Sequence, residues 1–213
     1  MRYTVTGSST GFGRAMTELV LAKGDIVVAT LRTPSMLTEL TTKYGKDKLL
    51  VLKLDVTDTA EVTACFAAAV KHFGRIDAVF NNAAYSIFGE AEAMSDATAR
   101  AMFDVNLWGA IAVSREAIRV FREVNKPIGG RLLNVSSAVG IDPVLGLAHY
   151  SAAKAGECVM LVVISVTRSH RRDAALIAFT EGMAKELDPA WNIKVGDLLH
   201  HHHSSPPYSS VVP

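Results

Sequence analysis

Cysteine is scarce in this sequence, which contains only Cys65 and Cys158. Two cysteines in such different surroundings indicate neither a disulfide framework nor a metal site, so we expect no bound metal. Proteins with so little cysteine are typical of reducing compartments. We therefore expect an intracellular, cytoplasmic protein.

Long hydrophobic runs and a strong charge of one sign are also missing. The longest largely apolar run covers residues 158–166, far short of the roughly 20 residues that a membrane helix requires. The formal net charge is only +1, which argues against a general partner for nucleic acid or an acidic membrane. The first residues resemble a strand and a glycine-rich turn, so no secretory signal peptide is expected.

The remaining pattern is an alternation of strand-like and helix-like segments, as in an α/β protein with a parallel sheet. At 213 residues, a single domain is expected. The predicted strands are residues 3–6, 25–30, 49–54, 76–80 and 131–135, with a sixth beginning at 191–195. The predicted helices are residues 13–23, about 33–45, 58–73 and 95–124.

Three glycines, Gly7, Gly11 and Gly13, lie where the first strand meets the first helix. Glycines permit a tight turn and a close backbone approach, and the helix N-terminus that follows favours an anion. The spacing G-x-x-x-G-x-G differs from the commonest dinucleotide fingerprint. A glycine-rich turn without a ligand is the alternative, but the strand–turn–helix setting favours a phosphate site.

The end of the second strand bears on which dinucleotide would bind. It reads Thr30-Leu31-Arg32 and has no carboxylate for a ribose 2′-hydroxyl. Arg32 is therefore a candidate for holding a 2′-phosphate, which favours NADP over NAD. An ordinary surface arginine is the alternative interpretation.

Tyr150 and Lys154 are four residues apart, so on a helix they share one face. An ammonium about 4 Å from a phenolate stabilises it by roughly 4 kcal/mol at an effective dielectric of 20. Tyr150 is then suited to exchange a proton with a substrate. Ser137, 13 residues before the tyrosine, is placed to hydrogen-bond the substrate oxygen.

With these features, the sequence resembles the short-chain dehydrogenase/reductase family, a group of one-domain Rossmann oxidoreductases. Six motifs carry the resemblance over residues 1–156: TGSSTGFG at 6–13, LDVTD at 54–58, NNAA at 81–84, VNLWG at 105–109, NVSS at 134–137 and YSAAK at 150–154. The resemblance implies a doubly wound, three-layer α/β/α domain over residues 1–195, followed by an irregular tail over residues 196–213. The family's last strand is expected to be missing.

The resemblance also implies the roles of individual residues. The implied catalytic residues are Asn106, Ser137, Tyr150 and Lys154, with Asn106 helping to hold a water that links Lys154 to solvent. The implied cofactor-binding residues are Gly7, Ser9, Gly11, Phe12, Gly13, Arg32, Asp55, Asn81, Ala83, Tyr150 and Lys154. Asp55 would contact the adenine, and Asn81 with Ala83 would line the adenine ribose. Ser136 is assigned to backbone contacts, and Asn106 has the alternative of a bent helix interior.

The pattern breaks after Lys154. Residues 157–175 interrupt the helix expected there, and the family's sequence resumes at Leu176. We interpret this segment as translated intron, since codons at both ends are compatible with splice sites, with a tolerated surface insertion as the alternative. The four histidines at 200–203 are interpreted as part of a low-complexity tail rather than a metal site.

The sequence thus predicts an NADP-dependent enzyme that interconverts a small-molecule carbonyl and a secondary alcohol. Assembly into a homo-oligomer is compatible with this prediction. The alternative is a non-catalytic dinucleotide-binding remnant from a truncated or mis-spliced gene. Nucleic-acid binding through the basic residues 168–172 is disfavoured, because a short charge run is usually a solvated face.

Overall fold

The computed structural model describes residues 1–158 and 188–198. Within them, a parallel sheet has the strand order β3-β2-β1-β4-β5-β6, so the order reverses between β1 and β4. Such a reversal is the topological switch point at which open α/β sheets bind ligands. The strands are β1 (Arg2–Thr6), β2 (Ile26–Leu31), β3 (Leu49–Lys53), β4 (Ala78–Asn81), β5 (Gly130–Val135) and β6 (Ile193–Leu198).

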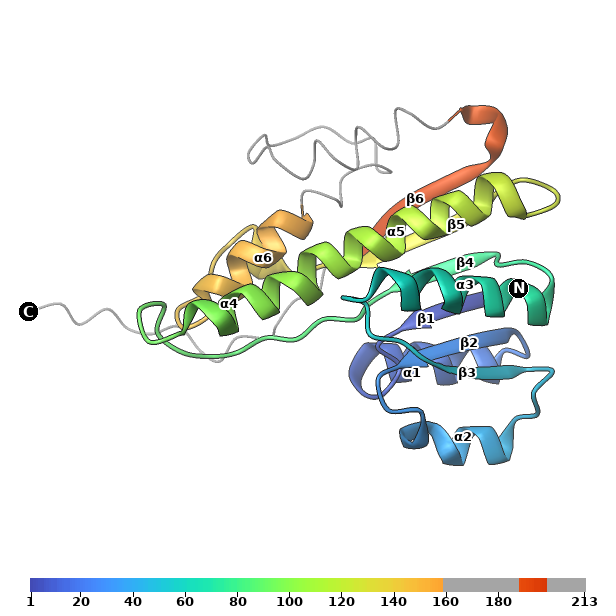
Figure 1. Ribbon diagram of the computed structural model, residues 1–213, viewed down its shortest axis with the longest axis horizontal. Helices are drawn as coiled ribbons and strands as arrows, with labels where there is room; N and C mark the ends of the chain where they lie inside the picture. The colour runs from blue at the N-terminus through green and yellow to red at the C-terminus, as the bar shows by residue number, and fades with distance from the viewer. Residues whose placement is uncertain (159–187, 199–213) are drawn as a thin grey trace, which may run out of the picture.

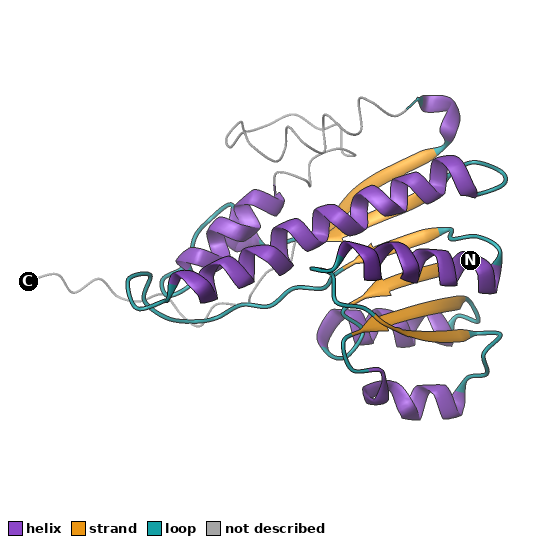
Figure 2. Ribbon diagram, in the orientation of Figure 1, coloured by secondary structure: helices purple, strands orange, loops and turns teal. Residues whose placement is uncertain are grey.

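Helices connect the strands and cover the sheet (Figures 1 and 2). The α-helices are α1 (Gly11–Ala22), α2 (Thr38–Lys43), α3 (Thr59–Phe73), α4 (Asp96–Phe103), α5 (Ala110–Arg119) and α6 (Ala148–Cys158). Short 3-10 turns are η1 (Pro34–Leu37), η4 (Ala138–Gly140) and η5 (Pro189–Trp191). The predicted doubly wound α/β fold is confirmed.

Local signals account for several of these boundaries. The side chain of Asp58 accepts hydrogen bonds from the first turn of α3, and Gly74 ends that helix in the left-handed conformation. Ser95 caps α4 by accepting from the backbone N–H of Thr98. Other boundaries differ from the prediction: α1 begins at Gly11 rather than residue 13, and β6 continues three residues beyond the predicted domain end.

The single helix predicted over residues 95–124 is divided by two π-helical segments. Segment η2 (Asp104–Gly109) lies between α4 and α5, and η3 (Val120–Val124) follows α5. The ribbon passes through all four pieces without a loop (Figure 2). Because π-helical turns concentrate at functional sites, η2 directs attention to Asn106 within it.

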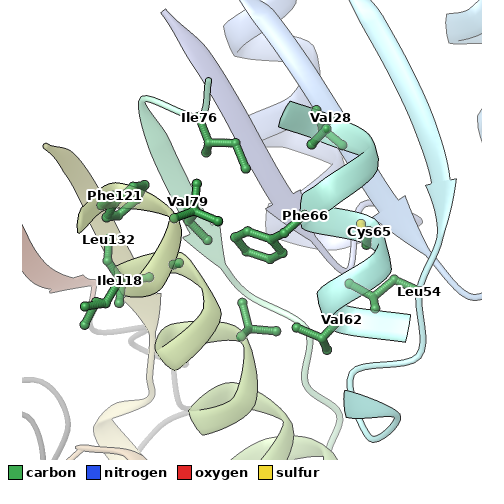
Figure 3. Packing of buried hydrophobic residues seen from close by; sticks show 14 of the residues in the cluster. Val28, Leu54, Val62, Cys65, Phe66, Ile76, Val79, Ile118, Phe121 and Leu132 are labelled. Atoms are coloured by element: carbon green, nitrogen blue, oxygen red, sulfur yellow. The ribbon is translucent and has the colours of Figure 1, made fainter. Parts of the chain in front are cut away.

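Two apolar clusters pack on opposite faces of the sheet. Val28 joins the cluster under α3 and α5, whereas its neighbours Val27 and Ala29 join the cluster under α1 and α2. This alternation follows from the pleat, which directs successive side chains to opposite faces. In the first cluster, the fully buried ring of Phe66 extends from α3 toward Val79 of β4 (Figure 3).

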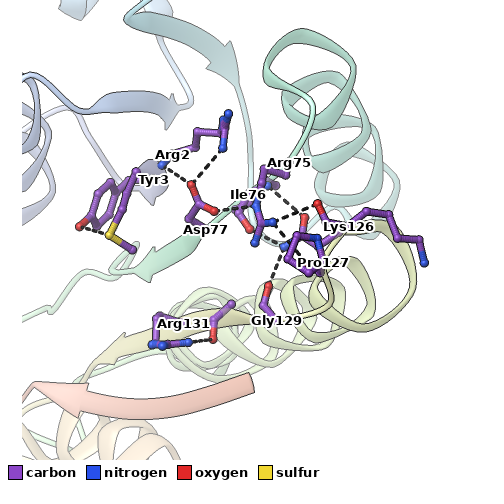
Figure 4. A network of polar contacts seen from close by, with 12 residues as sticks. Arg2, Tyr3, Arg75, Ile76, Asp77, Lys126, Pro127, Gly129 and Arg131 are labelled. Carbon is purple, nitrogen blue, oxygen red and sulfur yellow. Dashed lines mark hydrogen bonds and ion pairs between the residues drawn. The ribbon is translucent and has the colours of Figure 1, made fainter. Parts of the chain in front are cut away.

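A polar network ties together the amino ends of the strands, away from the switch point (Figure 4). Asp77 accepts from the backbone N–H of Arg2 at 2.8 Å and pairs with the Arg75 guanidinium at 2.6 Å. Arg75 also donates to the carbonyls of Lys126 and Pro127 at 3.2 and 3.3 Å. The end of the sheet opposite the switch point is thus fixed by charged hydrogen bonds.

Among the described helices, none has both the length and the apolar character needed to cross a bilayer. The predictions on residues 159–175, 200–203 and the remaining tail lie outside the described residues. So does residue 176, where the family pattern was predicted to resume.

Candidate active site

A cavity of about 320 Å³ lies at the carboxyl edge of the sheet, where the switch point occurs. Its lining comes mainly from the ends of β2 and β5 and the segments that follow β1 to β5, with further residues from α1, η2 and α6. Figure 1 shows α6 and α4 beyond this edge of the sheet. Of the predicted site residues, the cavity is lined by Gly7, Ser9, Gly11, Phe12, Arg32, Asp55, Ala83, Tyr150 and Lys154.

The glycine loop requires its glycines for two different reasons. Gly7 and Gly11 have φ values of +67° and +56°, which side chains with a Cβ rarely adopt. A Cβ on Gly7 would also lie 2.9 Å from the Cα of Ala83, whereas a Cβ on Gly11 would meet open space. The open side of the loop adjoins the first turn of α1, a fitting place for a pyrophosphate.

Gly13 serves close packing and does not line the cavity. A Cβ there would collide with the carbonyl oxygen of Gly7 and would lie 2.6 Å from Nδ2 of Asn82. Gly13 therefore lets the first turn of α1 approach both the loop and the segment after β4. Its predicted contribution to cofactor binding is indirect in this geometry.

The segment after β4 is joined to the end of β1 through one hydroxyl group. Thr6 Oγ1 accepts from the backbone N–H groups of Asn82 and Ala83, at 2.8 and 3.0 Å. Asn82 Nδ2 returns a hydrogen bond to the Thr6 carbonyl at 3.0 Å. Asn82 and Ala83 therefore reach the cavity as a fixed pair.

Asn81, predicted to line a ribose, lies in the interior instead. Its Nδ2 donates to the Ala110 carbonyl at 2.9 Å and to Asn134 Oδ1 at 2.8 Å, below the sheet edge. Asn82, which the sequence analysis did not select, lines the cavity. Adjacent residues of a strand end face opposite sides, and the motif alone does not say which one faces the ligand.

Asn106 is fully buried in η2 and does not line the cavity. Its Oδ1 accepts from the backbone N–H of Tyr85 at 3.0 Å, and its Nδ2 donates to the Tyr85 carbonyl at 2.7 Å. Tyr85 itself lines the cavity, a residue that sequence reasoning missed. The side chain of Asn106 thus positions a wall of the site.

Arg32 and Asp55 follow the neighbouring strands β2 and β3, line the cavity and have opposite charges. Asp55 Oδ1 accepts from the N–H of Thr57 at 3.0 Å and from its hydroxyl at 2.8 Å. These two hydrogen bonds lower the pKa of Asp55, and the positive charges of Arg32 and Lys53 add to the effect. Asp55 is therefore a carboxylate at neutral pH.

Tyr150 and Lys154 project from α6, both almost completely buried, and both line the cavity. Lys154 Nζ donates to the Val135 carbonyl at 3.1 Å, which fixes the ammonium at the end of β5. Tyr150 packs with Met102 and Val139. A phenol and an ammonium are thus held beside one cavity, as a proton relay requires.

The two serines after β5 differ in position. Ser136 lines the cavity, whereas Ser137, selected by its spacing to Tyr150, is fully buried and does not line it. The catalytic role predicted for Ser137 stays a prediction.

Comparison with known proteins agrees with this geometry. A sequence profile of the family described as "short chain dehydrogenase" matches residues 2–171. The chain belongs to this family. The resemblance carried by the six motifs is therefore confirmed, and with it membership of a family of NAD(P)-dependent oxidoreductases.

Individual family members cover the chain well. It is 36% identical to an uncharacterised oxidoreductase of Schizosaccharomyces pombe, over 90% of this chain and 56% of that protein. It is 35% identical to oxidoreductase calM of Penicillium decumbens, over 89% of this chain and 57% of the relative. The chain thus spans little more than half the length of these two relatives.

A solved structure supports the fold independently. The crystal structure of a short-chain dehydrogenase from Streptomyces avermitilis superposes with a TM-score of 0.74 at 30% identity. The match covers 92% of this chain and 64% of that one.

Proposed function

We propose that this short-chain dehydrogenase interconverts a carbonyl compound and a secondary alcohol, with NADP as its cofactor. The observation that carries the proposal is that Tyr150 and Lys154 line the same cavity as the glycine loop. A dinucleotide extending from Gly11 along the sheet edge would bring its nicotinamide toward Tyr150. The lining fits such a group, since Gly11 leaves open space at the phosphate end.

The proton transfer follows from the chain's own groups. Tyr150 donates its phenolic proton to the carbonyl oxygen during reduction and recovers a proton afterwards. The fixed ammonium of Lys154 stabilises the phenolate that remains. We assign Ser137 to orient the substrate oxygen, which requires its hydroxyl to become accessible to substrate. When bound, the nicotinamide supplies the hydride in reduction and accepts it in oxidation.

The decisive variant is Tyr150→Phe, which removes the proton donor and keeps the ring. We expect turnover of a carbonyl panel to fall roughly 100- to 10,000-fold, the usual contribution of general acid–base catalysis. The Kd for NADPH, measured by fluorescence, should change less than about threefold. Equal turnover by the variant and the wild type would refute the assignment of Tyr150.

The preference for NADP depends on Arg32. This residue lines the cavity at the end of β2, where a 2′-phosphate would be expected. Replacing it in Arg32→Ala should weaken NADPH binding roughly 10- to 150-fold, the value of a hydrogen bond to a charged group. NADH binding should change little. A wild-type protein that prefers NADH would overturn this part of the proposal.

The position of Ser137 also favours a second candidate, a dinucleotide-binding protein without catalysis. Ser137 lies fully buried outside the cavity lining. Under this alternative, NADPH raises the melting temperature, but no carbonyl or alcohol is turned over. Thermal shift and turnover measured on one sample therefore separate the two candidates.

Cytoplasmic location and assembly into a homo-oligomer stay predictions. Cell fractionation and light scattering, respectively, would test them.

A further inference from the structure

Two loops meet beside Tyr150 and are joined to each other. One covers residues 82–95 between β4 and α4, and the other covers residues 141–147 before α6. The backbone N–H of Gly89 donates to the Gly146 carbonyl at 2.9 Å. A ring nitrogen of His149 also lies 3.0 Å from the Ala91 carbonyl. The two loops therefore form one surface rather than two independent ones.

The Phe88 ring of the first loop packs against Gly146 of the second loop. A Cβ built on Gly146 would lie only 2.6 Å from two ring carbons of Phe88, so the aromatic edge rests directly on the glycine backbone. Gly146 has φ +77°, a conformation that suits glycine. The loop of residues 141–147 is thereby held against Phe88.

The joined loops expose large apolar side chains to solvent. The exposed fractions are 77% for Phe88, 61% for Ile141, 47% for Val144 and 91% for Leu145. We call these four residues the apolar rim. Single exposed apolar residues are ordinary, but a group of them on two joined loops indicates a binding surface.

The acidic and basic residues of the two loops have one sign of charge. Residues 82–95 and 138–149 contain Glu90, Glu92 and Asp142 but no lysine or arginine. A carboxylate or phosphate on a ligand would meet repulsion there and would lack a cation in these two loops to replace its hydration. The two loops therefore suit a neutral ligand.

The rim continues toward the catalytic tyrosine. Met94 from the first loop and Leu147 from the second pack against the cluster of Met102, Val139 and Tyr150. The two loops that carry the rim therefore also supply apolar side chains to the cluster around Tyr150.

We propose that the apolar rim binds the carbon chain of a neutral, apolar ketone whose carbonyl group lies at Tyr150. This inference rests on the proposed function. In the reduction, a hydride from a reduced nicotinamide dinucleotide bonds to the carbonyl carbon. The oxygen takes the phenolic proton of Tyr150, giving a neutral secondary alcohol and the oxidised dinucleotide. A neutral chain is covered by the rim during this step, whereas a chain that ends in a carboxylate is repelled.

The test compares methyl ketones from butan-2-one to decan-2-one and includes 9-oxodecanoate, which replaces the terminal methyl of decan-2-one by a carboxylate. Each methylene that the rim covers should raise kcat/KM roughly twofold to fourfold, from the value of a buried methylene. We expect 9-oxodecanoate to fall at least about tenfold below decan-2-one. A flat chain-length series, or equal use of the carboxylate, would overturn the inference.

Variants assign the effect to the rim. Leu145→Ser should flatten the chain-length series, because it should lower kcat/KM for decan-2-one more than for butan-2-one. Leu145→Lys should improve the use of 9-oxodecanoate. The matched control is Leu19→Ser on α1, which removes a leucine that is 52% exposed and outside the cavity lining, and it should change neither series.

The outcomes separate this inference from the proposed function. If all ketones were reduced at one rate and Tyr150→Phe still abolished the reaction, the proposed function would stand. The substrate-binding role of the rim would then be wrong. If the protein bound NADPH but turned over no ketone, both the proposed enzymatic function and the binding role of the rim would be refuted. A flat series combined with dissociation of an oligomer in Leu145→Ser would assign the rim to a second copy of the chain.

Discussion

Asn106 offers the sharpest test of how the structure supports its site. The variant Asn106→Leu keeps a similar side-chain volume but removes both hydrogen bonds to the backbone of Tyr85. A backbone group left without its partner costs roughly 1–3 kcal/mol. Because Tyr85 is itself 37% exposed, water can partly replace the lost partners. We therefore expect a loss of about 2–4 kcal/mol in the free energy of unfolding.

The consequence for the cofactor separates this effect from ordinary destabilisation. Tyr85 lines the cavity, so the loss of its support should also weaken NADPH binding by roughly tenfold or more. The control is Ser95→Ala, which removes the cap of α4 and costs about 1 kcal/mol without reaching Tyr85. Urea unfolding followed by circular dichroism gives the stability, and fluorescence titration gives the Kd. If Asn106→Leu kept wild-type stability within about 0.5 kcal/mol, or lost stability with an unchanged Kd, the positioning role would be wrong.

Three other predictions concern single contacts. Gly13→Ala should weaken NADPH binding at least tenfold, because the added methyl group would collide with Gly7 and Asn82. The control is Glu18→Ala at an exposed position of α1, which should leave the Kd for NADPH unchanged in the same fluorescence titration. Burial raises the pKa of the Cys65 thiol to about 12. In a Cys158→Ser background, a thiol reagent at pH 8 should therefore label Cys65 only after the protein unfolds. Rapid labelling of the native protein would contradict this. Thr57→Val removes a hydroxyl donor that helps lower the pKa of Asp55 below its ordinary 3.8. A carboxyl whose pKa is lowered by folding stabilises the folded state at pH values above its ordinary pKa of 3.8. The difference in free energy of unfolding between wild type and variant should therefore be largest near pH 7 and vanish as the pH falls below 3.8. A difference that stays constant with pH in urea titrations would refute it.

Local chemistry made much of the fold predictable. The helices predicted to begin at residues 58 and 95 have Asp58 and Ser95 as their N-caps, and the one predicted to end at residue 73 is followed by Gly74. These signals depend on neighbouring residues alone. The π-helical turns of η2 and η3 were not predicted, because residues 95–124 carry no proline or glycine cluster that would mark a break. The contact that accompanies η2 is a tertiary one, between Asn106 and Tyr85.

The order of the strands explains why two of the predicted site residues lie close together. Arg32 and Asp55 follow neighbouring parallel strands, and the structure brings both to one cavity. The direction of the side chains at a strand end was not predictable from the sequence. Asn81 and Asn82 have identical chemistry, and only the hydrogen bonds of Asn81 to Ala110 and Asn134 show which one faces inward. Tyr85 carried no signal of its own, since its position depends on Asn106.

The hydroxyl of Thr6 has a practical consequence for anyone redesigning this protein. The hydroxyl oxygen accepts hydrogen bonds from Asn82 and Ala83, and Thr6 itself directly precedes the glycine turn. This one atom therefore aligns the glycine loop after β1 with the segment after β4. Libraries that vary position 6 would disturb both segments together and confound every phenotype. Randomising Arg32 and Thr57 instead would vary the end of the cavity near Asp55 and leave these hydrogen bonds of Thr6 in place.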